Sequence, residues 1–395
     1  MNSRRALIFF LMTAACSAPP PPTPKVEAKP ERPLSPAAVA FNDTARFIAG
    51  LKGRPGSPLE ALEKTPAWTD YAKGFEETWS QYEQSQAEPV RAFEKRELAP
   101  IQPKGSYVFY PFSGPDVLYM TGFYPGRSTY VMVGLEPAGT LRAPGDFRAE
   151  EINVEMRDWT VAMQSIFRRS FFVTSEMDRQ FRGRVADGLL ESICLLLARS
   201  GYTIEGIQHG NVSEEGAFAP VDLATLGKDA KGKPRKAMGV EVAFRKGASG
   251  DPQKLYYFST RLDTEFTAKP GFSRFLTSLG EPDTLIKSAS FVMHWTTIDA
   301  FRKQVLASSR TILQDDTGVP FRMLQPPVWS VKLYGEYSMP DRPFRNWYQK
   351  SLADAFADPA KVSPLGFSLG YGAYRRPSSM MLARRTGAAA VMAQK

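Results

Sequence analysis

The segment 17–36 contains eight prolines, and this density limits where the chain can fold. Proline has no backbone N–H for helix or sheet hydrogen bonds, and its fixed φ favours an extended polyproline conformation. The segment therefore predicts a semi-rigid linker, from Cys16 to residue 36, ahead of the folded body. We expect one globular region over residues 37–385 and a frayed tail over residues 386–395.

The first 15 residues have the layout of a secretory signal peptide, with two arginines followed by an apolar run. That run, residues 6–15, is too short for a transmembrane helix, which needs about 20 residues. Cys16 follows two alanines, so the leader resembles that of a bacterial lipoprotein, although Thr13 stands where leucine is usual. The resemblance implies lipid on Cys16. Because Ser17 follows, it also implies an outer-membrane protein facing the periplasm or the cell surface.

The formal net charge of +9 is spread thinly along the chain. The densest basic cluster lies within residues 228–236 beside glycine and proline, and no aromatic residue interleaves its lysines. This composition favours a solvated loop over a nucleic-acid surface, so we expect no nucleic-acid partner. The other cysteine, Cys194, lies in an apolar run and is predicted to be a core residue.

Helical and strand periodicities alternate along the body, which predicts a mixed α/β fold with a helix-covered mixed β-sheet. Residues 37–100 read as mainly helical, and Thr65-Pro66 is a helix start. After it, aromatic residues recur every three or four positions, which indicates a helix face on the core; the alternative is a surface that stacks on sugar rings. These aromatic residues are Trp68, Tyr71, Phe75, Trp79 and Tyr82.

The remaining elements follow from shorter patterns. Strands are predicted at 106–110, 129–133, 202–208, 311–314, 329–333, 367–371 and 380–382, with a hairpin around residues 240–257. Helices are predicted at 116–121, 152–166, 178–199, 272–279, 284–293, 298–306 and 344–356.

The segment Tyr110-Pro-Phe-Ser-Gly-Pro-Asp116 follows a predicted strand and opens a predicted helix. Ser113 and Asp116 have the spacing of a capping box, which would satisfy the free N–H groups of that helix. The same geometry is where open α/β sheets bind ligands. We therefore take Ser113, Gly114 and Asp116 as candidate ligand-binding residues, with capping as the alternative.

Glu136 comes just after the next strand. If the two strands are parallel neighbours, Asp116 and Glu136 lie at the same edge of the sheet. A carboxylate pair there suits acid–base chemistry or a hard cation.

Asp315 and Asp316 precede Thr317-Gly318, and Asp-Thr-Gly is the tripeptide around an aspartic-protease carboxylate. Such enzymes need two copies, and the chain has one. A strand-ending turn fits better, with an aspartate bonding nearby amides and the glycine at positive φ. Asp315 is kept as a ligand candidate and Asp316 as a catalytic candidate.

His209 is a fourth catalytic candidate, beside Asp116, Glu136 and Asp316, because it is expected at a strand end. The sequence has no histidine zinc motif, no serine-hydrolase elbow, no Walker loop and no dinucleotide fingerprint. No cofactor and no metal-ligand set is assigned.

Four segments of the body together resemble an uncharacterised family of exported bacterial proteins, over about residues 105–384. They are the Tyr110–Asp116 segment, Lys287-Ser-Ala-Ser290, Gln314-Asp-Asp-Thr-Gly318 and the stretch from Gly366 to Tyr371. The resemblance implies one continuous folded unit and assigns no activity.

Two hypotheses about function remain. The first is an envelope lipoprotein, held on the membrane through Cys16, that binds a small molecule or an envelope protein. The second is a carboxylate-dependent hydrolase, with or without a metal, acting on an envelope or nutrient substrate. The hydrolase requires that Asp116, Glu136 and Asp316 share one cleft.

Overall fold

The computed structural model describes residues 32–102, 106–172, 186–228, 236–268, 270–373 and 377–386. The predictions for Cys16 and its leader, for most of the linker and the basic cluster, and for residues 387–395 lie outside the described residues. The first described helix, α1 (Pro36–Ile48), is capped by the Ser35 side chain and has proline in its first turn.

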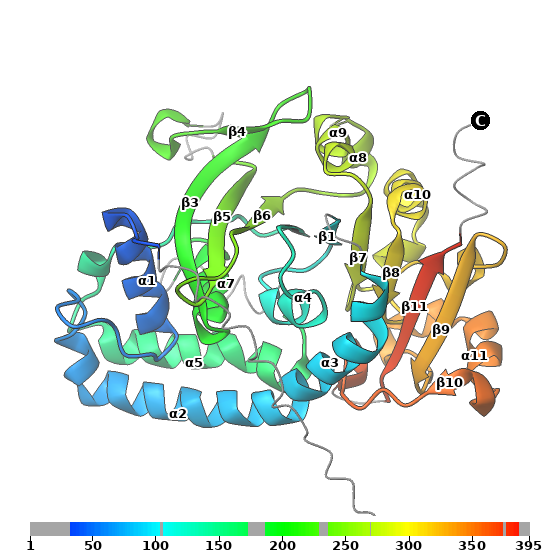
Figure 1. The fold of residues 1–395 in the computed structure, drawn as a ribbon, viewed down its shortest axis with the longest axis horizontal. Helices are drawn as coiled ribbons and strands as arrows, with labels where there is room; N and C mark the ends of the chain where they lie inside the picture. The colour runs from blue at the N-terminus through cyan, green and yellow to red at the C-terminus, as the bar shows by residue number, and fades with distance from the viewer. Residues whose placement is uncertain are drawn as a thin grey trace, which may run out of the picture.

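The centre of the fold is an 11-stranded mixed sheet with helices on both faces, which confirms the predicted α/β class (Figure 1). Five neighbouring strands, β8-β7-β1-β2-β6, run parallel, and antiparallel strands flank them on both sides. In spatial order the strands are β10 (Val362–Ser363), β9 (Trp329–Gly335), β11 (Ser379–Arg385), β8 (Thr311–Gln314), β7 (Pro282–Ile286), β1 (Tyr107–Tyr110), β2 (Thr129–Gly134), β6 (Gln253–Ser259), β5 (Gly239–Lys246), β3 (Tyr202–Val212) and β4 (Phe218–Pro220).

Alternate side chains of the parallel strands enter two separate cores. Val108 and Tyr110 join the larger core, under the helices that come early in the chain. Tyr107 and Phe109 join the second core, beneath the helices α9 (Pro270–Ser278) and α10 (Asp299–Ser308). The remaining helices are α2 (Pro66–Tyr82), α3 (Glu88–Phe93), α4 (Val117–Phe123), α5 (Ile152–Arg169), α7 (Leu190–Arg199), α8 (Thr264–Ala268) and α11 (Lys350–Phe356).

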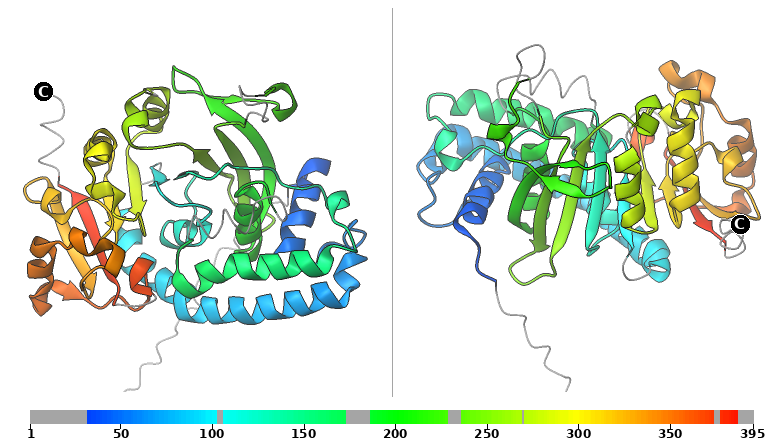
Figure 2. Two further views of the ribbon diagram at one scale, coloured as in Figure 1. Left: turned by 180° about the vertical axis from the view of Figure 1, so that it is seen from behind. Right: turned by 90° about the horizontal axis from the view of Figure 1, so that it is seen from above.

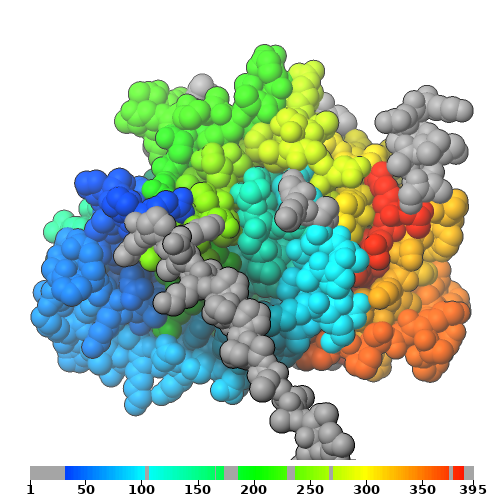
Figure 3. Space-filling view, in the orientation of Figure 1, coloured from blue at the N-terminus to red at the C-terminus, as the bar shows by residue number. Residues whose placement is uncertain are grey.

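The long helices α2 and α5 lie side by side along the larger core, as the front and back views show (Figures 1 and 2). Thr65 caps α2 and Pro66 occupies its first turn, as predicted. The aromatic face of α2 is pressed on the core, with only Trp79 partly exposed. The first helices and the last strands lie at opposite ends of the molecule (Figure 3).

Three predicted elements are wrong. Residues 284–293 do not form the predicted α-helix: residues 284–286 end β7, whose short apolar run is buried between two parallel strands, and residue 292 begins a short 3₁₀ helix. Residues 367–371 form no strand. The last two of them belong to a 3₁₀ turn, η12 (Gly370–Ala373). The helix predicted over 344–356 is divided into a 3₁₀ helix, η10 (Arg342–Trp347), and α11.

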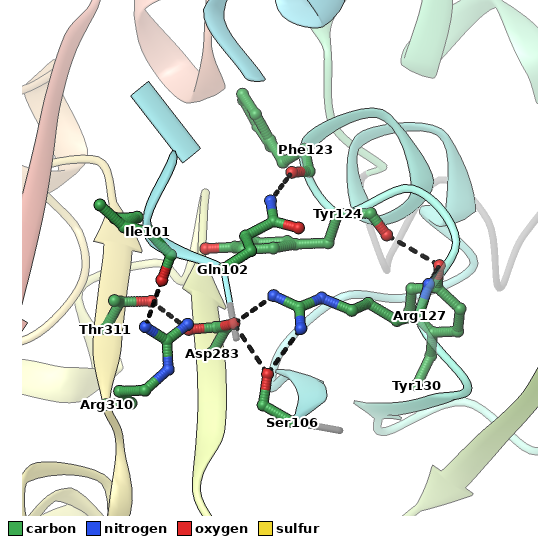
Figure 4. Close-up of polar contacts among 10 residues, drawn as sticks. All are labelled: Ile101, Gln102, Ser106, Phe123, Tyr124, Arg127, Tyr130, Asp283, Arg310 and Thr311. Atoms are coloured by element: carbon green, nitrogen blue, oxygen red, sulfur yellow. Dashed lines mark hydrogen bonds and ion pairs between the residues drawn. The ribbon is translucent and has the colours of Figure 1, made fainter. Parts of the chain in front are cut away.

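Asp283 on β7 forms a buried polar cluster at the amino ends of the parallel strands (Figure 4). Its carboxylate accepts from Arg127 Nη2 at 2.6 Å and from Thr311 Oγ1 at 2.6 Å, and it also pairs with Arg310. Ser106 Oγ adds a hydrogen bond of 3.2 Å. One carboxylate thus joins β7 and β8 to the loop that follows α4.

Substituting Asp283→Asn is expected to lower the free energy of unfolding by about 3–5 kcal/mol, because Arg127 keeps a buried charge without its partner. Urea denaturation measures this loss. As a control, Asp354→Asn removes an exposed pair with Lys350 and is expected to change stability by at most about 0.5 kcal/mol. Equal stabilities for the two variants would contradict the assigned role of Asp283.

Candidate functional site

The carboxyl ends of β1, β7 and β8 lie next to one another in the sheet and carry most of the candidate residues. Three loops leave these ends: residues 111–116 after β1, residues 287–291 after β7 and residues 315–318 after β8. We call these loops together the strand-end site. In open α/β sheets, this is the edge at which ligands bind.

Strained backbone concentrates at the strand-end site. Every described non-glycine residue with a left-handed φ lies in these loops or contacts them, and glycine is the residue that normally adopts such angles. These residues are Phe112 (φ 60°), Ser170 (φ 60°), Ser288 (φ 53°), Ser290 (φ 48°) and Phe291 (φ 55°). Such strain persists only where surrounding contacts fix it, and it clusters at functional sites.

Asp116 is the N-cap of α4, and its carboxylate accepts from the Tyr119 amide at 3.2 Å. It is also bound by the Tyr110 hydroxyl at 2.9 Å and by Lys287 Nζ at 2.8 Å. The capping-box prediction, which made Ser113 the N-cap, is therefore wrong. The N-cap lies three residues later, at Asp116, and Asp116 caps the helix alone. Ser113 lies in the turn before it and donates its amide to the Val133 carbonyl at 2.9 Å.

Lys287 is the residue that sequence reasoning missed. Its side chain is buried directly after β7, pairs with Asp116, donates to the Ser170 carbonyl and lies 4.3 Å from the centre of the Tyr119 ring. These contacts compensate for the loss of hydration around the ammonium group. The available signal was a lysine directly after the apolar pair Leu285-Ile286, because a lysine drawn into a buried segment needs a partner.

Asp315 fixes the geometry of two loops. Its carboxylate accepts from the Ser288 amide at 2.8 Å and from the Thr317 amide at 2.9 Å, which confirms the predicted turn. Gly318, however, does not have the expected positive φ. It is glycine for a different reason, since a Cβ there would overlap the Gln314 side chain.

Tyr371 in η12 covers the loop after β7. Its hydroxyl donates to the Ser288 carbonyl at 3.2 Å and shares a hydrogen bond of 2.9 Å with Ser290 Oγ. Burial raises the pKa of Tyr371, and the nearby charges of Asp315 and Asp316 raise it further. The preceding Gly370 has a positive φ, and a Cβ there would overlap the Asp315 carboxylate. The turn is thus fitted closely to the strand-end site.

Asp316 is buried beside Asp315, and its backbone carbonyl accepts from Gln349 Nε2 at 3.0 Å. His294 also faces this loop. Burial lowers the pKa of His294 to about 4, the charges of Arg302 and Arg322 act in the same direction, and the nearby backbone of residues 316 and 318 opposes the shift.

Glu136 and His209 do not join the strand-end site. The strands β1 and β2 are parallel neighbours as required, but Glu136 bonds its own loop through the Leu135 amide at 3.2 Å. No described hydrogen bond or ion pair links Glu136 to Asp116. His209 lies inside β3 rather than at a strand end, which corrects the prediction, and its Nε2 lies 2.7 Å from the Gly139 carbonyl oxygen.

A separate groove of about 390 Å³ lies between α2 and α5, and its lining includes Tyr71, Phe75 and Met163.

Within the described ranges, no group of three or more histidine, cysteine, aspartate or glutamate side chains is arranged to hold a metal ion. Cys194 is buried as predicted, and burial raises the pKa of its thiol. No helix in the described part of the chain is long and apolar enough to cross a membrane.

No protein-family model matches the chain, and neither a curated protein nor a solved structure does. The resemblance to a family of exported proteins therefore stays a prediction.

The low pKa of His294 predicts a stability that falls with acidification. The folded protein keeps His294 neutral down to about pH 4, whereas the unfolded chain protonates it near pH 6.5. Protons therefore favour the unfolded chain between these values, and the histidine is expected to reduce the free energy of unfolding by about 2 kcal/mol from pH 7 to pH 5. Urea denaturation at the two pH values should show a smaller loss in His294→Gln. An equal loss in both proteins would refute the assignment.

Proposed function

We propose that the chain is a lipid-anchored protein of the outer membrane whose folded body binds a small polar ligand at the strand-end site. The leader and Cys16 support the anchor, and the linker separates the folded body from the lipid. The strand-end site supports the binding function, since it lies at the edge where parallel sheets receive ligands.

One observation carries the binding proposal: all the described non-glycine residues with left-handed φ gather at this single edge. Each such residue costs about 1–3 kcal/mol, and folding alone gives no reason to place them together. Strain of this kind fixes backbone groups in positions that a relaxed loop does not adopt. Backbone N–H and C=O groups positioned in this way suit a polar ligand.

The hydrolase alternative remains a prediction that the geometry supports less well. It needs carboxylates with free oxygens in one cleft. Asp116 is occupied by its helix cap and by Lys287, Asp315 is occupied by loop amides, and Glu136 bonds its own loop. Asp116 and Asp315 hold the strand-end site in shape, Glu136 lies outside it, and binding is therefore the function that we propose.

The anchor is tested by Cys16→Ser. Wild-type protein expressed with an alkyne-labelled fatty acid is expected to carry the label and to sediment with outer membranes. The variant should lose the label, keep its leader uncleaved by the lipoprotein peptidase and become extractable without detergent. A variant that is still processed and stays in the membrane fraction would refute lipid attachment at Cys16.

The binding site is tested by hydrogen exchange. A thermal-shift screen of sugars, amino acids, nucleotides and dicarboxylates should yield a stabilising compound. That compound is expected to slow amide exchange in residues 111–116, 287–291 and 315–318. Protection confined to the groove between α2 and α5, or no stabilising compound, would refute binding at the strand-end site.

A further inference from the structure

The loop after β7 continues beyond the strand-end site and presents an exposed tryptophan. Trp295 is 45% exposed, and Thr296 and Thr297 beside it are exposed as well. Trp295 and Tyr348 are the two aromatic side chains among the exposed large hydrophobic residues of the described chain. The backbone beneath the indole is fixed, because Arg302 Nη1 donates to the carbonyls of Met293 at 2.8 Å and of Trp295 at 2.9 Å.

The 3₁₀ helix η10 extends this surface from a distant part of the sequence. The Phe344 ring lies 5.3 Å from that of Phe291, and the Trp347 ring lies 5.7 Å from that of His294. The ring of Phe344 also stacks on Tyr371, at 5.3 Å, above the strand-end site. Residues 290–297 and 342–348 thus form one continuous surface, which we call the aromatic platform.

The exposed side chains of the platform combine three chemical types. Aromatic faces come from Trp295 and Tyr348, and cations come from Arg342 and Arg345. Neither arginine makes an ion pair with any described residue, and the nearby Arg322 adds a third cation. The hydrogen-bonding groups are those of Ser290, Thr296, Thr297 and Asn346.

We propose that the aromatic platform binds an acidic oligosaccharide; this names the ligand of the proposed strand-end site and rests on that proposal. The weakly positive C–H face of a sugar ring packs on the negative face of the Trp295 indole. Carboxylates on the sugar accept bidentate hydrogen bonds from Arg342 and Arg345. The hydroxyl and amide groups between them bond the sugar hydroxyls.

Two other ligands use part of this chemistry. Single-stranded nucleic acid also combines aromatic stacking with cations, but an exported protein has little access to it. An anionic bilayer attracts tryptophan and arginine, yet a bilayer-facing surface would carry aliphatic side chains where this platform carries serine, threonine and asparagine. The polar groups therefore favour the oligosaccharide.

The test uses the full mature chain with Cys16→Ser and isothermal titration calorimetry at low salt. The probes are an alginate hexasaccharide, which has a carboxylate on every ring, and uncharged maltohexaose. We expect the charged sugar to bind more tightly and to weaken as salt is raised. Trp295→Ala should weaken both sugars at least tenfold, whereas Arg345→Ala should weaken only the charged one.

Two control variants each remove part of an exposed side chain, one apolar and one cationic, away from the aromatic platform. Val161→Ala shortens an exposed apolar side chain on α5, and Arg96→Ala removes an exposed arginine that pairs with Glu97; both should bind as wild type does. Unchanged binding in Trp295→Ala and Arg345→Ala would overturn the proposal. So would preference for a thymidylate hexamer or for phosphatidylglycerol vesicles over both sugars. A different compound that protects the strand-end site would refute the oligosaccharide alone and leave the proposed function standing.

Discussion

Two buried charges lie at opposite ends of β7, Asp283 near its start and Lys287 directly after its last residue. The segment that contains α4 is attached to both. Lys287 is four residues after Asp283, which in extended chain separates their backbones by about 13 Å. The seven residues of α4 span about 10 Å. Asp116 at its start pairs with Lys287, and Arg127 just beyond its end pairs with Asp283. These two ion pairs attach the segment from Asp116 to Arg127 to both ends of β7.

This attachment explains how the loops at the strand-end site keep their strained conformations. The Lys287–Asp116 pair ties the loop after β7 to the loop after β1, and the Ser170 carbonyl on the same ammonium group adds the end of α5. Asp315 and Tyr371 then bind the amide and the carbonyl of Ser288. Ser288, which is bonded on both sides, cannot relax to a negative φ without breaking these two hydrogen bonds, whose loss offsets the strain that would be relieved.

Features that depend on residues close together in the sequence could be predicted, whereas contacts between residues far apart in the sequence could not. Thr65-Pro66 and the aromatic spacing define α2 within one helix, and Asp315 closes a turn within three residues, so both were predictable. The strand β7 was mistaken for a helix because a strand buried on both faces loses its alternation. The role of Lys287 depends on Asp116 and Ser170, which only the folded sheet brings next to it. Asp116 was identified as a candidate, but its partner was not.

The site has two parts: buried residues that fix the conformation of the loops, and exposed residues that can contact a ligand. The carboxylate oxygens of Asp116 and Asp315 are occupied by hydrogen bonds and an ion pair, so these two residues act as a rigid base. The exposed groups stand on the loop that leaves β7 and on η10, which packs against that loop through Phe291 and His294. A surface fixed in this way loses little conformational entropy when a ligand binds. Selectivity for a ligand then depends on the side chains of the platform, which are free to vary without disturbing the ion pairs beneath them.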